Sequence, residues 1–172
     1  MPTRSGRFAI SIKFLIALLT GVLLGSVVQT QFNLAALQSM GVEIPTMLRL
    51  ETTLQDLTTF APVYAALFIA GFLPSQIAAV LISRWLGGKL QALLSAGAAA
   101  IGLLVSLKIV DSVAPMPTFI AATREISGLI AMLLCAALAG WLFALLNGHS
   151  RNTHLSHPTD LPALHCGRVS VA

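Results

Sequence analysis

Four apolar runs, each long enough to cross a lipid bilayer, most constrain what this 172-residue chain can fold into. They cover residues 8–28, 63–82, 90–110 and 126–146. Because a helix rises about 1.5 Å per residue, each run covers the ~30 Å hydrocarbon layer. A transmembrane strand barrel would instead alternate apolar and polar residues. We therefore predict an all-α integral membrane protein, built as a four-helix bundle.

The composition agrees with a bundle that lies in hydrocarbon. Hydrophobic residues make up 56% of the chain and charged residues only 9%, whereas soluble domains carry about a quarter charged residues. One bundle takes up nearly the whole length. We predict a four-span transmembrane domain over residues 1–147 and a flexible cytoplasmic tail over residues 148–172.

The positions of lysine and arginine predict the orientation, because cytoplasmic loops of membrane proteins are enriched in basic residues. With the N-terminus inside, seven basic residues are cytoplasmic (Arg4, Arg7, Lys13, Arg84, Lys89, Arg151, Arg168) and three are external (Arg49, Lys108, Arg124). We expect a bacterial-type inner membrane protein with both termini in the cytoplasm. The basic residues are scattered singly, so the net charge of +4 gives no sign of a nucleic-acid partner.

The first apolar run follows a basic start, which is also the layout of a secretory signal peptide. The residues after it, 25–31, contain no convincing small-residue cleavage pattern, and the helical pattern continues to about Met40. We therefore expect an uncleaved membrane anchor.

The longest external segment, between the first and second runs, carries apolar residues at helical spacing. They are Met47, Leu50, Leu54, Leu57 and Ala61, which recur on one face. Pro45 and Thr46 mark a start for this helix. We predict a short amphipathic external helix that lies on the outer leaflet or caps the bundle. The alternative is a lid over a site between the helices or a partner-docking face, the latter formed by Leu50, Leu54 and Leu57.

Pro74 interrupts the second run near the bilayer midplane. A proline inside a helix removes one backbone hydrogen bond and clashes with the carbonyl four residues earlier, so we predict a helix break or kink near residues 70 and 71. Ser75 and Gln76 follow directly, and we expect Gln76 to face another helix rather than lipid. Pro74, Ser75 and Gln76 are therefore candidates for polar packing between helices or for contact with a ligand.

Small residues recur at helical spacing in three of the runs, which predicts close helix packing. They are Gly21 and Gly25 in the first run, Ser95, Ala99, Gly102 and Ser106 in the third, and Ser127, Ala131, Cys135 and Ala139 in the fourth. Such faces serve packing within one molecule or in a dimer, and we favour the former.

Residue types that carry metal or acid–base chemistry are absent from the run centres. All four histidines and Cys166 fall within residues 149–166, and their spacing matches no zinc pattern. No histidine lies in a run, which excludes a bis-His haem site within this chain. No Asp, Glu or Arg lies near a run centre, which argues against a proton relay. We expect no metal, no cofactor and no enzymatic activity.

These features predict a non-enzymatic accessory, assembly or scaffolding subunit of the membrane. Its expected partners are the lipid bilayer and either another membrane protein or further copies of the chain. The alternative function is a small transporter or channel with a pathway near the predicted helix break at Pro74.

Overall fold

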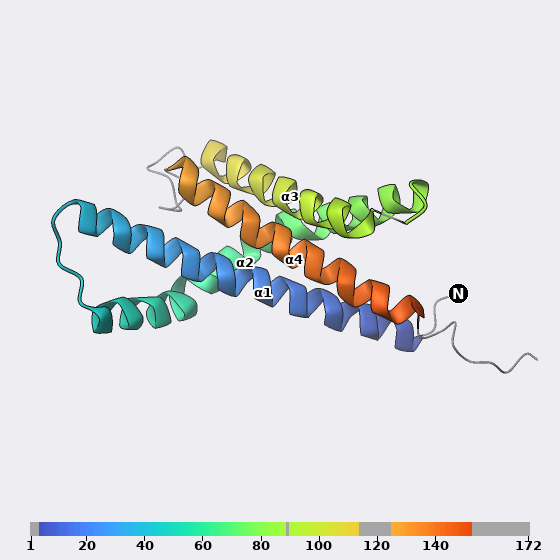
Figure 1. Ribbon diagram of the computed structural model, residues 1–172, viewed down its shortest axis with the longest axis horizontal. Coiled ribbons are helices and arrows are strands. Elements are labelled where there is room, and N and C mark those ends of the chain that lie inside the picture. Colours follow the sequence, from blue (N-terminus) through green and yellow to red (C-terminus); the bar gives the residue numbers. More distant parts are fainter. Residues whose placement is uncertain (1–3, 89, 114–124, 153–172) are drawn as a thin grey trace, which may run out of the picture.

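The computed structural model describes residues 4–88, 90–113 and 125–152, which form four helices (Figure 1). Their bounds are Arg4–Ser39 (α1), Thr46–Trp85 (α2), Gln91–Val113 (α3) and Ile126–Asn152 (α4). All four are long and apolar enough to cross a membrane. The all-α prediction is therefore confirmed for the described part of the chain, in which no strand occurs.

The helices form a ring in the order of the sequence. α2 packs against α1 and α3, and α4 packs against α3 and α1; α2 and α4 barely touch across the centre. α2 and α3 form an antiparallel pair, and the turn between them contains Gly87 and Gly88 at φ values of 72° and 81°. Only glycine adopts such angles readily, so these two residues make the tight reversal possible.

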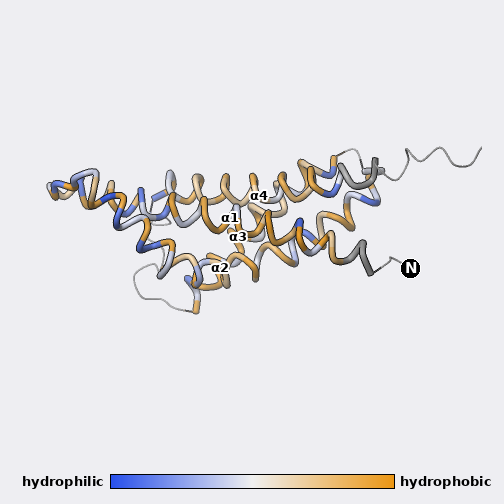
Figure 2. The backbone as a smooth tube through the Cα atoms, turned by 90° about the horizontal axis from the view of Figure 1, so that it is seen from below, coloured by the Kyte–Doolittle hydropathy of each residue, from blue (hydrophilic) through white to orange (hydrophobic). Residues whose placement is uncertain are grey.

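The surface of this bundle differs from that of a soluble bundle, although its core is also mostly apolar. Large apolar side chains cover the outside of the ring, as at Leu134, which is 59% exposed. A few polar side chains lie inside it among apolar ones, as at Gln76, which is 3% exposed. Figure 2 shows the hydrophobic colouring along the length of the bundle. This surface matches hydrocarbon, because only an apolar solvent makes it favourable to expose so many such side chains.

The predicted separate external helix is wrong, because its residues form the first part of the continuous 40-residue helix α2. The sequence changes from polar to apolar near residue 60, and that change alters the surroundings of the chain without breaking its backbone. Pro62 and Pro74 both lie inside α2, so the helix continues through Pro74 without a break, and the predicted kink near residues 70 and 71 stays a prediction. Proline removes one hydrogen bond, but its fixed φ is helical.

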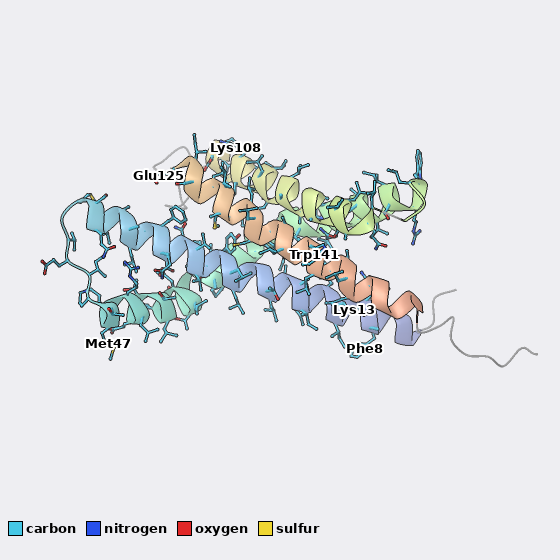
Figure 3. All side chains as sticks on the ribbon, viewed as in Figure 1. Phe8, Lys13, Met47, Lys108, Glu125 and Trp141 are labelled. Carbon is cyan, nitrogen blue, oxygen red and sulfur yellow. The ribbon has the colours of Figure 1, made fainter. Side chains whose placement is uncertain are left out.

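α1 and α2 are longer than a bilayer requires. Their 36 and 40 residues correspond to about 54 and 60 Å of helix, against ~30 Å of hydrocarbon. As predicted, α1 continues nearly to Met40; Gly41, at φ 86°, follows it in the turn. Residues 29–60 thus form a helical hairpin beyond the bundle, here called the projecting hairpin. Figure 3 places Met47 in this hairpin, farther along the molecule than Lys108 and Glu125.

Glycines bring the helix backbones into contact within one molecule. A Cβ atom added to Gly102 would lie 2.5 Å from the carbonyl oxygen of Gly71, so α2 and α3 touch at their backbones. Gly140 lies equally close to the α3 backbone at Ser95. The small residues of α3 therefore serve packing within the bundle. On α4 the stripe differs from the prediction, because Ser127 is exposed and Gly140 makes the closest approach.

The glycine contacts predict a large effect of one methyl group. Gly71→Ala should destabilise the bundle by about 1–3 kcal/mol, because the new Cβ would clash with the α3 backbone at Gly102. Gly97→Ala is the matched control, since Gly97 has no atom within 4 Å of such a Cβ and alanine favours helix. Unfolding of both variants in detergent micelles measures the difference. Equal stability of the two would contradict the backbone contact.

Candidate functional site

A buried polar network joins three helices inside the bundle. The side-chain amide of Gln76 donates from Nε2 to the carbonyl oxygen of Ser95 at 3.1 Å. The Ser95 hydroxyl in turn lies within hydrogen-bond reach of Gln76 Oε1 and, at 2.6 Å, of the Gly140 carbonyl oxygen. One hydroxyl hydrogen is thus shared between two acceptors. The network links α2 to α3 and α4, with both polar ends of the Gln76 amide engaged.

The structure does not bring the three residues predicted around the proline together. Pro74 is exposed on the outer surface of α2, and Ser75 is half-buried and donates to the Phe72 carbonyl oxygen at 2.8 Å. Gln76 alone faces the interior, towards α3 as expected. A ligand contact at these residues stays a prediction.

A second polar cluster holds the projecting hairpin together. Arg49 of α2 donates to two side-chain oxygens of α1, to Gln31 Oε1 at 3.3 Å and to Gln38 Oε1 at 2.8 Å. Gln31 Nε2 donates to Thr53 Oγ1 at 3.2 Å, and Thr53 donates back to the Arg49 carbonyl oxygen at 2.7 Å. A single guanidinium therefore bridges two turns of the facing helix.

Nearer the bundle, the hairpin contains a carboxylate. The hydroxyl of Thr30, which is fully buried, donates to Asp56 Oδ2 at 2.7 Å. Charge-assisted hydrogen bonds of this kind are stronger than neutral ones. The pair fixes the register of α1 against α2 where the hairpin joins the bundle.

With its polar side chains turned inward, the hairpin presents apolar side chains to its surroundings. Met47, Leu50 and Leu54 are 76%, 57% and 57% exposed, and they lie at i, i+3 and i+7 on one face of α2. We call these three residues the apolar stripe. Of the predicted docking residues, Leu50 and Leu54 lie in it, whereas Leu57 is half-buried beside it. The apolar stripe is thus left largely uncovered by the other described residues.

Sequence reasoning missed the polar core of the hairpin. It described only the apolar residues of this segment and assigned no hydrogen-bond partner to Arg49 or Asp56. The signal was in α1, where Gln31 and Gln38 are seven residues apart and therefore share a face. These two glutamines lie on the part of α1 that extends beyond the apolar run, and both accept hydrogen bonds from Arg49 of α2.

Two buried hydroxyls lie at the contact between α1 and α2 in the bundle. Ser26 Oγ and Tyr64 OH have no hydrogen-bond partner among the described residues. The ring of Tyr64 packs against Gly25, where a Cβ atom would lie 2.6 Å from the hydroxyl oxygen. Tyr64 also stacks on Phe60, with ring centroids 5.6 Å apart. The ring, rather than the hydroxyl, thus provides the stabilising contacts.

The described residues contain no group of three or more metal-ligating side chains. The histidine side chains and Cys166 lie outside the residues whose side chains are described. Comparison of the chain with protein-family models, curated proteins and solved structures gave no match.

The interior network predicts a modest and specific loss of stability. Gln76→Leu should destabilise the bundle by about 1 kcal/mol, the usual size of an interhelical hydrogen bond in a membrane. Ser95→Ala removes the other partner, and the double variant should cost less than the sum of the two single changes. Unfolding of all three variants in the same detergent gives the coupling. Strictly additive effects would mean that the two side chains do not interact.

The unpartnered hydroxyl predicts an unusual outcome for a buried tyrosine. Tyr64→Phe should leave stability unchanged or raise it by about 1 kcal/mol, because it removes a buried polar group without a partner while keeping the ring. Tyr64→Ala, which removes the ring as well, should cost about 3–5 kcal/mol. Thermal unfolding compares the pair. A marked loss in the phenylalanine variant would reveal a partner for the hydroxyl.

Proposed function

We propose that this protein is a multi-pass protein of a bacterial-type inner membrane, with both termini in the cytoplasm. In the membrane it acts as a non-enzymatic accessory, assembly or scaffolding subunit. The apolar exterior of the ring supports the membrane location, and the distribution of lysine and arginine supports the orientation. In this orientation the projecting hairpin lies on the outer side of the membrane.

The apolar stripe carries the proposal. A leucine contributes about 1.5–3 kcal/mol when it is removed from water, so two exposed leucines and a methionine form a strong potential contact. The spacing i, i+3 and i+7 matches the anchors by which one helix packs against another. We infer that the occupant is a helix of a partner membrane protein.

The surroundings of the stripe fit a protein interface. Glu51, Gln55 and Thr58 are exposed and follow one edge of it. Protein interfaces combine an apolar centre with a polar rim of this kind. The internal hydrogen bonds of Arg49 keep the hairpin in one conformation, which lowers the entropy lost on binding.

A transporter or channel with a pathway near Pro74 has less support. Pro74 lies on the outer surface of α2, and the amide of Gln76 is bound to Ser95. The glycine contact between Gly71 and Gly102 also closes the space between α2 and α3 at this level.

The stripe is tested by the double variant Leu50→Ser, Leu54→Ser in the full chain. We expect normal folding and at least a tenfold loss of the co-purified partner, because most of the apolar contact is removed. Purification in mild detergent followed by quantitative mass spectrometry measures the partner.

Leu48→Ser is the matched control. Leu48 is 45% exposed on the same hairpin but on another face of α2, so its partner recovery should be unchanged. Recovery of a homo-oligomer alone, together with solute flux in liposomes, would overturn the proposed function in favour of transport. Equal partner recovery from the double variant and the wild type would remove the stripe as the docking site.

A further inference from the structure

A groove between α1 and α2 opens at the end of the bundle opposite the projecting hairpin. It has a volume of about 520 Å³, within the ~300–1,000 Å³ range of small-molecule sites. Its walls are apolar except for three residues, Ser11, Gln76 and Arg84. Phe143 of α4 also lines it. This groove takes no part in the docking surface described above.

The groove exists because α1 and α2 separate between their last aromatic contact, Phe14–Phe72, and the end of the bundle opposite the projecting hairpin. Phe14 packs against Phe72 with ring centroids 5.4 Å apart, and edge-on against Phe143 at 5.8 Å. Beyond these rings α1 follows α4 and α2 follows α3, and the two pairs separate at this end (Figure 1). The rings therefore form the inner end of the groove, which runs from there to the end of α2.

A second, polar cavity continues the groove. It has a volume of about 250 Å³ and lies where α2 turns into α3, lined by Ser83, Gln91, Gly87 and Gly88. Val80 and Arg84 line both spaces, so the two adjoin along one side of α2. Together they form a site that is apolar along most of its length and polar at one end.

The dimensions of the groove match one leaflet of a bilayer. From Leu73 to Arg84 α2 rises by about 16 Å, roughly half of the ~30 Å hydrocarbon thickness. The apolar part thus has the length of the acyl-chain region of one leaflet, and Arg84 is placed at the headgroup level. Such a division suits an amphiphile from the membrane better than a soluble ligand.

The charge at the polar end selects an anion. Arg84 is the one charged residue that lines either space, and no carboxylate lines them among the described residues. The described residues offer it no ion pair, and the hydroxyl of Ser83 and the amide of Gln91 are donors beside it. A guanidinium binds phosphate through two parallel hydrogen bonds.

We infer that the groove binds an anionic glycerophospholipid of the surrounding leaflet. One acyl chain lies along α2 between Phe14 and Val80, and the phosphate lies at Arg84 with Ser83 and Gln91 as further donors. A helix of a second copy fits less well, because the polar cavity has room for a headgroup but not for a helix. The inference rests on the membrane location of the bundle and is independent of the docking role of the hairpin.

Native mass spectrometry of the full chain in mild detergent tests the site. Phosphatidylglycerol and phosphatidylcholine with identical acyl chains are the probes, supplied at equal concentration. We expect one phosphatidylglycerol per chain to be retained in preference to phosphatidylcholine. Arg84→Gln should reduce phosphatidylglycerol retention roughly fivefold, the effect of one basic side chain at an anionic lipid surface. Lys108→Gln, which removes an exposed charge at the other end of the bundle, is the control.

A second pair of variants tests the acyl-chain part of the groove. Val80→Trp should fill it and lower the retention of both lipids, whereas Val105→Trp on the exterior of α3 should lower neither. Circular dichroism confirms that each variant is folded, and Arg84→Lys should retain part of the preference for phosphatidylglycerol. Equal retention of the two lipids by the wild type would overturn the inference, as would unchanged retention in Arg84→Gln. A change of oligomeric state in Val80→Trp without loss of lipid would assign the groove to a second copy.

Discussion

Polar groups inside this protein find their partners within the chain, because the apolar exterior of the bundle offers them none. The rest of the structure depends on this constraint. Gln76 is accommodated inside the bundle because Ser95 offers its side-chain amide both a carbonyl acceptor and a hydroxyl donor. In the projecting hairpin, which lies beyond the bundle, Arg49 and Asp56 are also hydrogen-bonded to side chains of α1. The apolar exterior follows, since the side chains that need no partner are left to face outward.

Close packing is the second condition for the interior network. Interhelical hydrogen bonds require short distances between backbones, and Gly71, Gly102 and Gly140 provide them. Ser95 reaches Gly140 because α3 and α4 touch at this point. Small residues and buried polar residues therefore act together: the former bring the helices close, and the latter set their register.

The number of helices and the approximate positions of the spans could be predicted from the sequence, because both follow from the length of apolar runs. The course of α2 could not. The prolines at 62 and 74 suggest interruptions, yet packing on both sides keeps a helix intact through a residue that lacks one hydrogen bond. The inward face of the hairpin was equally hidden, since a stripe such as Met47, Leu50 and Leu54 has the same period whether it faces inward or outward.

The position of Ser95 also bears on the order of assembly. Synthesis proceeds from the N-terminus, so α2 and α3 are made before α4 is complete. The partner of the Ser95 hydroxyl on α2, the Gln76 amide, is therefore available before α4 is made. When α4 arrives, the carbonyl of Gly140 joins the same hydroxyl. Ser95 thus links α3 first to α2, through Gln76, and then to α4, through Gly140.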